Sequence, residues 1–171
     1  SLKTNILIET FNNKILNKRT LISSVSLNSK KVKKNSVFFG VKGQKFDGNK
    51  FGIEAIKNNA ILAITNKRFK NSRNIFSKNP LEKLNKLSSV YRKSLDSNNI
   101  AITGSAGKTS VKDLTGFCLN KLDKTYYSKN SFNNKYGVPL SIINSPQSTK
   151  FSVLEVGMDK KGEIDKLTKI I

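Results

Sequence analysis

Short apolar runs alternate along the chain with segments whose apolar residues recur at helical spacing. The runs are rich in β-branched and aromatic residues and predict six strands: 36–42, 60–65, 74–76, 99–103, 125–128 and 151–156. Helical spacing predicts helices at 51–59, at 80–95, after residue 110 (with Val111, Leu114, Cys118 and Leu122 on one face), at 139–143, and from Gly162 onward, still running at Ile171. Residues 1–20 fit a short helix or a strand. This alternation indicates an α/β fold.

Two polar breaks divide this pattern into parts. Residues 66–79 are rich in Lys and Asn, and Pro80 stands where proline is tolerated, in the first turn of a helix. We therefore expect a small α/β N-terminal domain over 1–79, a connector helix over 80–97, and the start of a doubly wound, mostly parallel sheet over 98–171. Open sheets of that type usually have more than the three strands predicted here, so we expect the chain to be a truncated part of a longer protein.

Composition narrows the class of protein. Hydrophobic residues make up 36% of the chain and charged residues 25%, as in a folded protein. The longest apolar run, 60–64, is far shorter than the roughly 20 residues that span a bilayer, so we expect a cytoplasmic protein without membrane insertion. One Cys excludes an intrachain disulfide, and the lack of His excludes a Ser-His-Asp triad within this chain.

The net charge of +21 comes from 28 Lys and 4 Arg against 11 acidic residues. Such a surplus suggests nucleic-acid binding, but proteins that read nucleic acids favour Arg, and the lysines here are scattered through every segment. We therefore attribute most of the charge to a compositional bias and expect no specific nucleic-acid partner. Residues 1–85 carry 18 basic and 4 acidic side chains, a net +14, so we expect this half to bind an anionic ligand.

The strongest chemical signal is the sequence from Thr103 to Ser110, TGSAGKTS, between a predicted strand and a predicted helix. A Gly-rich turn exposes backbone N–H groups, and the following helix N-terminus adds partial positive charge, so the two bind polyphosphate oxygens. Lys108 is placed to reach the β- and γ-phosphates, and the Thr109 hydroxyl to ligate Mg²⁺. The strict P-loop spacing puts its first glycine at Ile102; here the glycine is Gly104. The alternative is a surface turn, which the flanking strand and helix disfavour.

Glu155 is the second candidate residue. It stands near the end of an apolar strand that we expect beside the phosphate-loop strand, where P-loop enzymes place an acidic Mg²⁺ ligand. The alternative is a solvent-facing strand residue. Together with the loop, Glu155 predicts that 98–171 begins a P-loop ATPase domain that binds ATP and Mg²⁺.

Three further segments are similar to the motifs of one family. They are Asn130 to Leu140 (NSFNNKYGVPL), Leu154 to Ile164 (LEVGMDKKGEI), and 28–30 (NSK) followed by 36–51 (SVFFGVKGQKFDGNKF). With the phosphate loop they resemble, in order and over nearly the whole chain, the Mur ligases, and most closely the member that adds D-alanyl-D-alanine. Where the family commonly has His, this chain has Asn49.

The resemblance implies an ATP-dependent amide ligase of peptidoglycan precursor synthesis. ATP would phosphorylate the terminal carboxylate of UDP-N-acetylmuramoyl-tripeptide, and the amine of D-alanyl-D-alanine would attack the acyl phosphate. By motif matching, the catalytic residue would be Lys108, the Mg²⁺ ligands Thr109 and Glu155, and the ATP-binding residues Gly104, Ser105, Ala106, Gly107, Lys108, Thr109 and Ser110. The substrate-binding residues would be Ser29, Lys42, Gly43, Asp47, Gly48, Asn133 and Asn134. We expect a monomer that is inactive as the isolated chain.

Three other functions stay open at this point. One is another Mur-type ligase or a folylpolyglutamate-type ligase. Another is a P-loop nucleotide-binding module without catalysis, and the third is a nucleic-acid-binding module, which the charge of +21 motivates. Nucleotide binding, compared with strand or sequence preference for nucleic acid, separates them.

Overall fold

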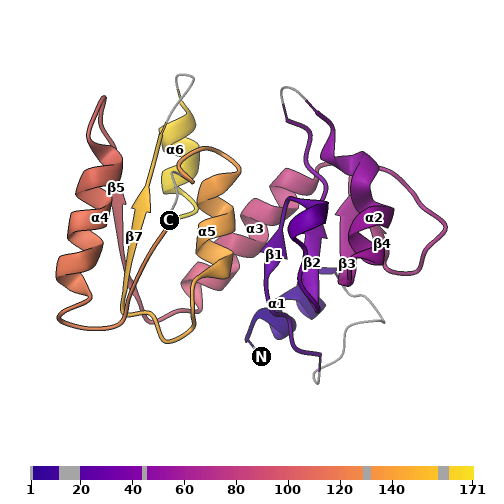
Figure 1. The fold of residues 1–171 in the computed structure, drawn as a ribbon, viewed down its shortest axis with the longest axis horizontal. Helices are drawn as coiled ribbons and strands as arrows, with labels where there is room; N and C mark the ends of the chain where they lie inside the picture. Colours follow the sequence, from indigo (N-terminus) through magenta and orange to yellow (C-terminus); the bar gives the residue numbers. More distant parts are fainter. Residues whose placement is uncertain (1, 12–19, 44–45, 129–131, 158–161) are drawn as a thin grey trace. The chain divides into compact units, whose positions relative to one another are not determined.

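A computed structural model describes residues 2–11, 20–43, 46–128, 132–157 and 162–171 (Figure 1). The chain forms two compact units, Ser1–Leu87 and Ser88–Ile171. The boundary between them lies inside α3 (Pro80–Lys93), the helix predicted as a connector. Among the described residues, no helix is long and apolar enough to cross a membrane.

The first unit is built on a parallel sheet with the strand order β1-β2-β3-β4. Its strands and helices are β1 (Val25–Ser26), β2 (Ser36–Phe39), β3 (Ala60–Thr65), β4 (Asn74–Phe76), α1 (Leu2–Phe11) and α2 (Gly52–Lys57), with short 3₁₀ turns η1 (Ser29–Lys31) and η2 (Gly48–Phe51). Phe38 packs with Ala55 and Ile56 of α2, whereas the ring of its neighbour Phe39 lies 6.2 Å from that of Phe11 in α1. Because successive strand residues point to opposite faces, α1 and α2 cover opposite faces of the sheet.

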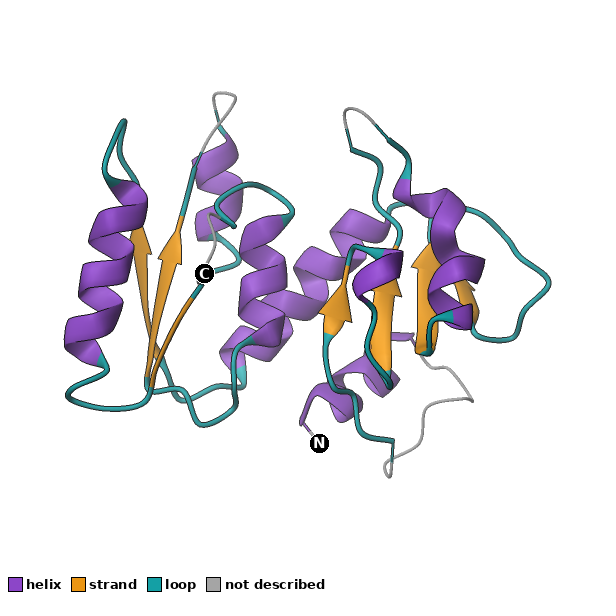
Figure 2. Cartoon of the chain, viewed as in Figure 1, coloured by secondary structure: helices purple, strands orange, loops and turns teal. Residues whose placement is uncertain are grey.

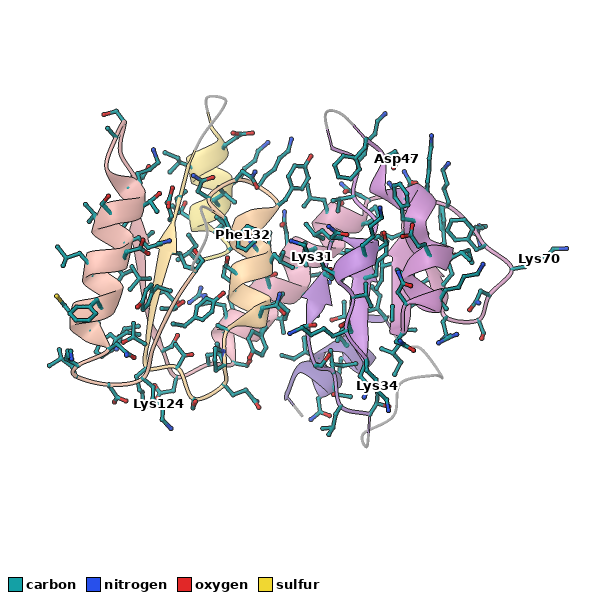
Figure 3. The ribbon with its side chains drawn as sticks, in the orientation of Figure 1. Lys31, Lys34, Asp47, Lys70, Lys124 and Phe132 are labelled. Carbon is teal, nitrogen blue, oxygen red and sulfur yellow. The ribbon has the colours of Figure 1, made fainter. Side chains whose placement is uncertain are left out.

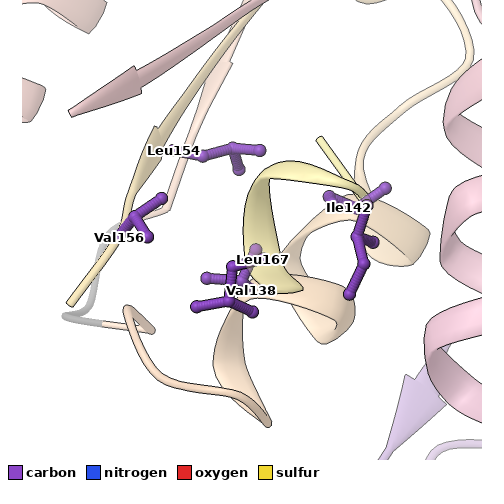
Figure 4. Packing of buried hydrophobic residues seen from close by; sticks show 6 residues of the cluster. Val138, Ile142, Leu154, Val156 and Leu167 are labelled. Atoms are coloured by element: carbon purple, nitrogen blue, oxygen red, sulfur yellow. The ribbon is translucent and has the colours of Figure 1, made fainter. Parts of the chain in front are cut away.

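The second unit has a parallel sheet with the order β5-β7-β6, formed by β5 (Asn98–Ile102), β6 (Thr125–Tyr127) and β7 (Phe151–Glu155). Helix α4 (Lys108–Leu119) lies on one face, and α5 (Gly137–Asn144) and α6 (Glu163–Thr168) lie on the other (Figures 1 and 2). Leu154 packs with Val138 and Ile142 of α5 and Leu167 of α6 (Figure 4). The alternation along β7 therefore turns Glu155 toward α4.

The predicted strands and helices are confirmed, with differences at their ends. The segment 1–20, left open between helix and strand, contains α1. Strand β2 ends at Phe39, because the chain turns after it and the Val41 carbonyl accepts the N–H of Gly48 (2.9 Å). The prediction of a last helix running to Ile171 is wrong: α6 ends at Thr168, whose hydroxyl donates back to the Asp165 carbonyl (3.0 Å).

Candidate nucleotide-binding site

The phosphate loop joins the end of β5 to the start of α4. Gly107 has φ = +73°, which L side chains rarely adopt, so the chain needs glycine at this turn into the helix. The first helical bond runs from the Val111 N–H to the Gly107 carbonyl (3.0 Å), so the N-terminus of α4 and its partial positive charge face the loop. The Lys108 ammonium donates to the Gly104 carbonyl (2.8 Å), which folds this side chain over the loop.

Glu155 meets the loop from the neighbouring strand. Parallel pairing sets Glu155 beside Ile102, the last residue of β5, so the carboxylate lies where the loop begins. It is only 2% exposed. The Thr109 hydroxyl donates to Oε2 (2.8 Å) and the Asn133 amide donates to Oε1 (2.7 Å). The prediction that the Glu155 strand lies beside the phosphate-loop strand is confirmed, and the solvent-facing alternative is wrong.

These side chains line one open cavity of about 380 Å³ in the second unit. Its lining residues are Gly107, Lys108, Thr109, Ser110, Asn133 and Glu155. The lining combines a helix N-terminus and an ammonium, which attract anions, with one buried carboxylate, which attracts cations. A phosphate group with its metal ion carries both kinds of charge.

The donor set fits Mg²⁺. This ion prefers oxygen ligands, and at nucleotide sites it takes only one or two carboxylates, with phosphates and waters completing the shell. Thr109 and Glu155 supply a hydroxyl and a carboxylate that already lie 2.8 Å apart. Within the described ranges no cluster of three or more His, Cys, Asp or Glu side chains is found.

The two Asn residues predicted on the substrate side have different environments. Asn133 orients Glu155, and its carbonyl accepts the N–H of Gly157 (2.6 Å), so it belongs to the carboxylate cluster, a role that the sequence did not indicate. The Asn134 side chain accepts the N–H groups of Tyr136 (3.1 Å) and Gly137 (2.9 Å), just where α5 begins. Substrate contact by either residue stays a prediction. The motif residues 130–131 and 158–161 lie outside the described part of the chain.

The substrate residues predicted in the first unit follow the carboxyl ends of β1 and β2. Ser29 lies in η1, after β1. After β2, Lys42 and Asp47 form an isolated antiparallel bridge that brings Gly43 and Gly48 into one turn. Figure 3 shows Asp47 at this edge of the sheet and Lys34 at the opposite edge. Carboxyl-end edges of parallel sheets are where such folds bind ligands.

Asp47 is held in its charged form by its neighbours. Its carboxylate accepts both the side-chain amide of Asn49 (2.7 Å) and the backbone N–H of Asn49 (3.0 Å). The side-chain bond is the largest cause of a lowered Asp47 pKa, and the charges of Lys67 and Lys50 add to it. Asn49 also accepts the N–H of Asn66 (2.8 Å), so this residue joins the turn to the end of β3.

The sequence of the chain matches two family models and several curated proteins. The model "Mur ligase family, catalytic domain" matches residues 21–109, and the model "Mur ligase middle domain" matches 102–171. UDP-N-acetylmuramoyl-tripeptide–D-alanyl-D-alanine ligase of Bacillus subtilis is 31% identical over 89% of this chain and 34% of its own length. The enzyme of the same name from Buchnera aphidicola (strain APS) is 34% identical over 84% of the chain and 32% of its own length.

Solved structures give the same result. A MurF crystal structure from Acinetobacter baumannii matches with a TM-score of 0.85 at 26% identity, over 98% of this chain and 38% of its own. MurF ligase from Thermotoga maritima, in complex with ADP, matches with a TM-score of 0.79 at 32% identity, over 90% of this chain and 36% of its own. The chain thus spans about a third of the length of these relatives. The first family model alone covers more than half of the 171 residues, and the chain belongs to the Mur ligase family.

Proposed function

We propose that the protein to which this chain belongs is an ATP-dependent amide ligase that joins D-alanyl-D-alanine to UDP-N-acetylmuramoyl-tripeptide. The curated relatives that match nearly the whole chain carry the name of this ligase. The observation that carries the proposal is the hydrogen bond from Thr109, at the start of α4, to the buried carboxylate of Glu155. It joins the phosphate loop to an acidic residue of the neighbouring strand, as P-loop phosphoryl transfer requires. We place the reaction in the cytoplasm, where ATP is available.

The residues of the second unit would bind and activate ATP. The loop from Gly104 to Gly107 and the N-terminus of α4 would bind the phosphate oxygens. Lys108 would exchange the Gly104 carbonyl for the transferred phosphoryl group and neutralise its charge. Thr109 and Glu155 would hold Mg²⁺, which supplies charge neutralisation when bound.

The reaction would proceed through an acyl phosphate. The terminal carboxylate of the tripeptide would attack the γ-phosphorus of ATP, breaking its bond to the β–γ bridging oxygen and releasing ADP. The free amine of D-alanyl-D-alanine would then attack the acyl carbon, lose a proton and displace inorganic phosphate to form the amide. The turn around Asp47 and Gly48 and the residue Ser29 would bind the UDP-sugar portion, whose diphosphate suits the net charge of +14 over residues 1–85. In this proposal, 1–79 is the domain that binds the UDP-sugar-peptide, 80–97 is the connector helix, and 98–171 is the first part of the ATP-binding domain.

The Lys108→Ala variant of the full-length protein tests the phosphate-loop role. Loss of one preorganised group that stabilises developing charge costs about 10²–10³-fold in rate, so ligation is expected to fall by at least that factor. Amide product and released phosphate are measured with UDP-N-acetylmuramoyl-tripeptide and D-alanyl-D-alanine as substrates. The control is Lys121→Ala, an exposed lysine after the end of α4. Wild-type ligation by Lys108→Ala would exclude the proposed role, and ligation of single amino acids instead of the dipeptide would indicate another member of the family.

The Glu155→Gln variant tests the metal site. It keeps the size of the side chain but removes the charge that attracts Mg²⁺, so the Mg²⁺ concentration for half-maximal activity is expected to rise at least about tenfold. A magnesium titration measures this shift both in ligation and in the binding of a fluorescent ADP analogue. Asp165→Asn, which neutralises an exposed acid in α6, is the matched control. An unchanged midpoint in Glu155→Gln would remove this residue from the metal site.

A further inference from the structure

Helix α4 faces the sheet with polar and small residues. Thr109, Lys112 and Gly116 stand at positions i, i+3 and i+7, which lie on one side of a helix. Lys112 and Gly116 are buried, and Thr109 reaches Glu155. The apolar side chains point the other way: Val111 is 51% exposed and Leu114 is 64% exposed. The contacts of α4 with this sheet therefore come from its polar and small residues.

Lys112 supplies one of these contacts. Its side chain is fully buried, which is rare for lysine. The ammonium donates to the backbone carbonyl of Ser128, the residue that follows β6, and forms an ion pair with Asp113 Oδ1 at 3.1 Å. It thus joins the middle of α4 to the point where the chain leaves β6.

Gly116 supplies the second contact, one turn further along. A Cβ atom at this position would lie 2.4 Å from the ring of Tyr127 in β6, so only glycine lets the helix approach the strand this closely. Lys112 and Gly116 therefore hold α4 against two consecutive residues, Tyr127 and Ser128. The third contact of the same helix face, Thr109 with Glu155, is the one that belongs to the nucleotide site.

A buried lysine at this position carries a free-energy penalty. Burying an ammonium requires desolvation, and an apolar side chain of similar length would avoid that penalty. What an apolar side chain lacks is a directional bond to one particular carbonyl. Such a bond favours the one rotation of the helix in which it forms, as buried polar groups fix the register of packed helices in coiled coils. Since Thr109 lies on the same face three residues earlier, that rotation also decides whether its hydroxyl reaches Glu155.

We propose that Lys112 is a positioning residue of the nucleotide site: its bond to the Ser128 carbonyl sets the rotation of α4 at which Thr109 meets Glu155. The proposal rests on the proposed function, because Thr109 and Glu155 matter only if they hold the Mg²⁺ that accompanies the nucleotide. Lys112 does not line the cavity and acts through Thr109.

The Lys112→Met variant of the full-length protein tests this proposal. Methionine keeps the length of the side chain and loses the ammonium. Binding of a fluorescent ADP analogue is measured against Mg²⁺ concentration, without any turnover. The half-saturating Mg²⁺ concentration is expected to rise about tenfold, the lower end of the range for groups that orient metal ligands. Lys121→Met, the same change at an exposed lysine, is the matched control and should keep the wild-type midpoint.

A double variant separates positioning from a general structural role. In a Thr109→Val background, Lys112→Met is expected to shift the Mg²⁺ midpoint no further, because the group through which it acts is already gone. Equal shifts in both backgrounds, or a folded Lys112→Met protein with a wild-type midpoint, would overturn the proposal. If Lys112→Met does not fold, Lys112→Gln, which keeps one donor, is measured in the same way. A wild-type protein that binds no ADP analogue at any Mg²⁺ concentration would instead refute the proposed function.

Discussion

The Glu155 carboxylate is oriented by hydrogen bonds from two single residues. Its two carboxylate oxygens each accept one hydrogen bond, from Thr109 and from Asn133. Both donors are neutral, so they orient the carboxylate without cancelling its charge, and each oxygen keeps a lone pair for a cation. The sequence predicts Thr109 and Glu155, because a phosphate loop and a neighbouring strand have recognisable patterns. It does not predict the contact of Asn133 with Glu155, because the segment between β6 and α5 has no periodicity that would indicate its course.

Tyr91 is the residue whose titration bears on stability. It is fully buried, its hydroxyl donates to the Ser145 carbonyl (2.8 Å), and burial raises its pKa to about 12 from 10.0. A raised pKa means that its contribution is fully present below about pH 10 and is lost as the pH rises from 10 through about 12.

The Tyr91→Phe variant is therefore expected to lose about 1 kcal/mol of unfolding free energy at pH 8, the value of one hydrogen bond. Its stability should also fall less steeply than that of the wild type between pH 10 and 12, in the window set by the raised pKa. Urea unfolding at pH 8, 10 and 12 measures both effects. The remaining slope includes Tyr126, whose pKa burial also raises. A variant with the wild-type slope would show that Tyr91 does not titrate in this window.

At the scale of elements, α4 departs most from what its sequence suggests. Helical spacing predicts the helix and puts Val111, Leu114, Cys118 and Leu122 on one face; that face is exposed. The buried face has Thr109, Lys112 and Gly116 instead, because the helix must present a hydroxyl to Glu155 and come close to β6. Apolar periodicity predicts that this segment is a helix. The side of the helix that contacts the sheet is set by the Thr109 hydroxyl, the Lys112 ammonium and the lack of a side chain at Gly116.

The Gly116→Ala variant tests this close approach. In an exposed helix the change would stabilise by about 1 kcal/mol. Here the new Cβ would lie 2.4 Å from the near side of the Tyr127 ring, so we expect a loss of about 1–3 kcal/mol from overpacking. Denaturant unfolding measures the change. Leu114→Ala, on the exposed side of the same helix, should change stability by less than about 0.5 kcal/mol, although it removes more atoms. A stabilised Gly116→Ala protein would contradict the packing.

For the molecule as a whole, the α/β class, the parallel sheets and the place of the phosphate loop follow from the sequence. The strand at 60–65 is predicted with its observed bounds, since a buried parallel strand forms an apolar run. The edge strand at 74–76, which has no buried residue, is also predicted with its observed bounds. The substrate side is less predictable. Only the structure shows that Asn49 keeps the turn of Asp47 joined to the end of β3. The net charge is spread as well. Of the lysines labelled in Figure 3, Lys31 and Lys34 lie between β1 and β2, Lys70 lies between β3 and β4, and Lys124 precedes β6, which favours a compositional origin.

The bond between the Lys108 ammonium and the Gly104 carbonyl has a consequence for affinity. A phosphate oxygen that reaches this ammonium must displace the carbonyl, so one acceptor is traded for another. Binding strength at Lys108 then reports the difference between two hydrogen bonds and not the full strength of one. A ligand with a weakly charged oxygen at this position gains little binding free energy from the exchange, and a doubly charged phosphoryl group gains most. The loop is therefore selective for the charge of its ligand as well as for its shape.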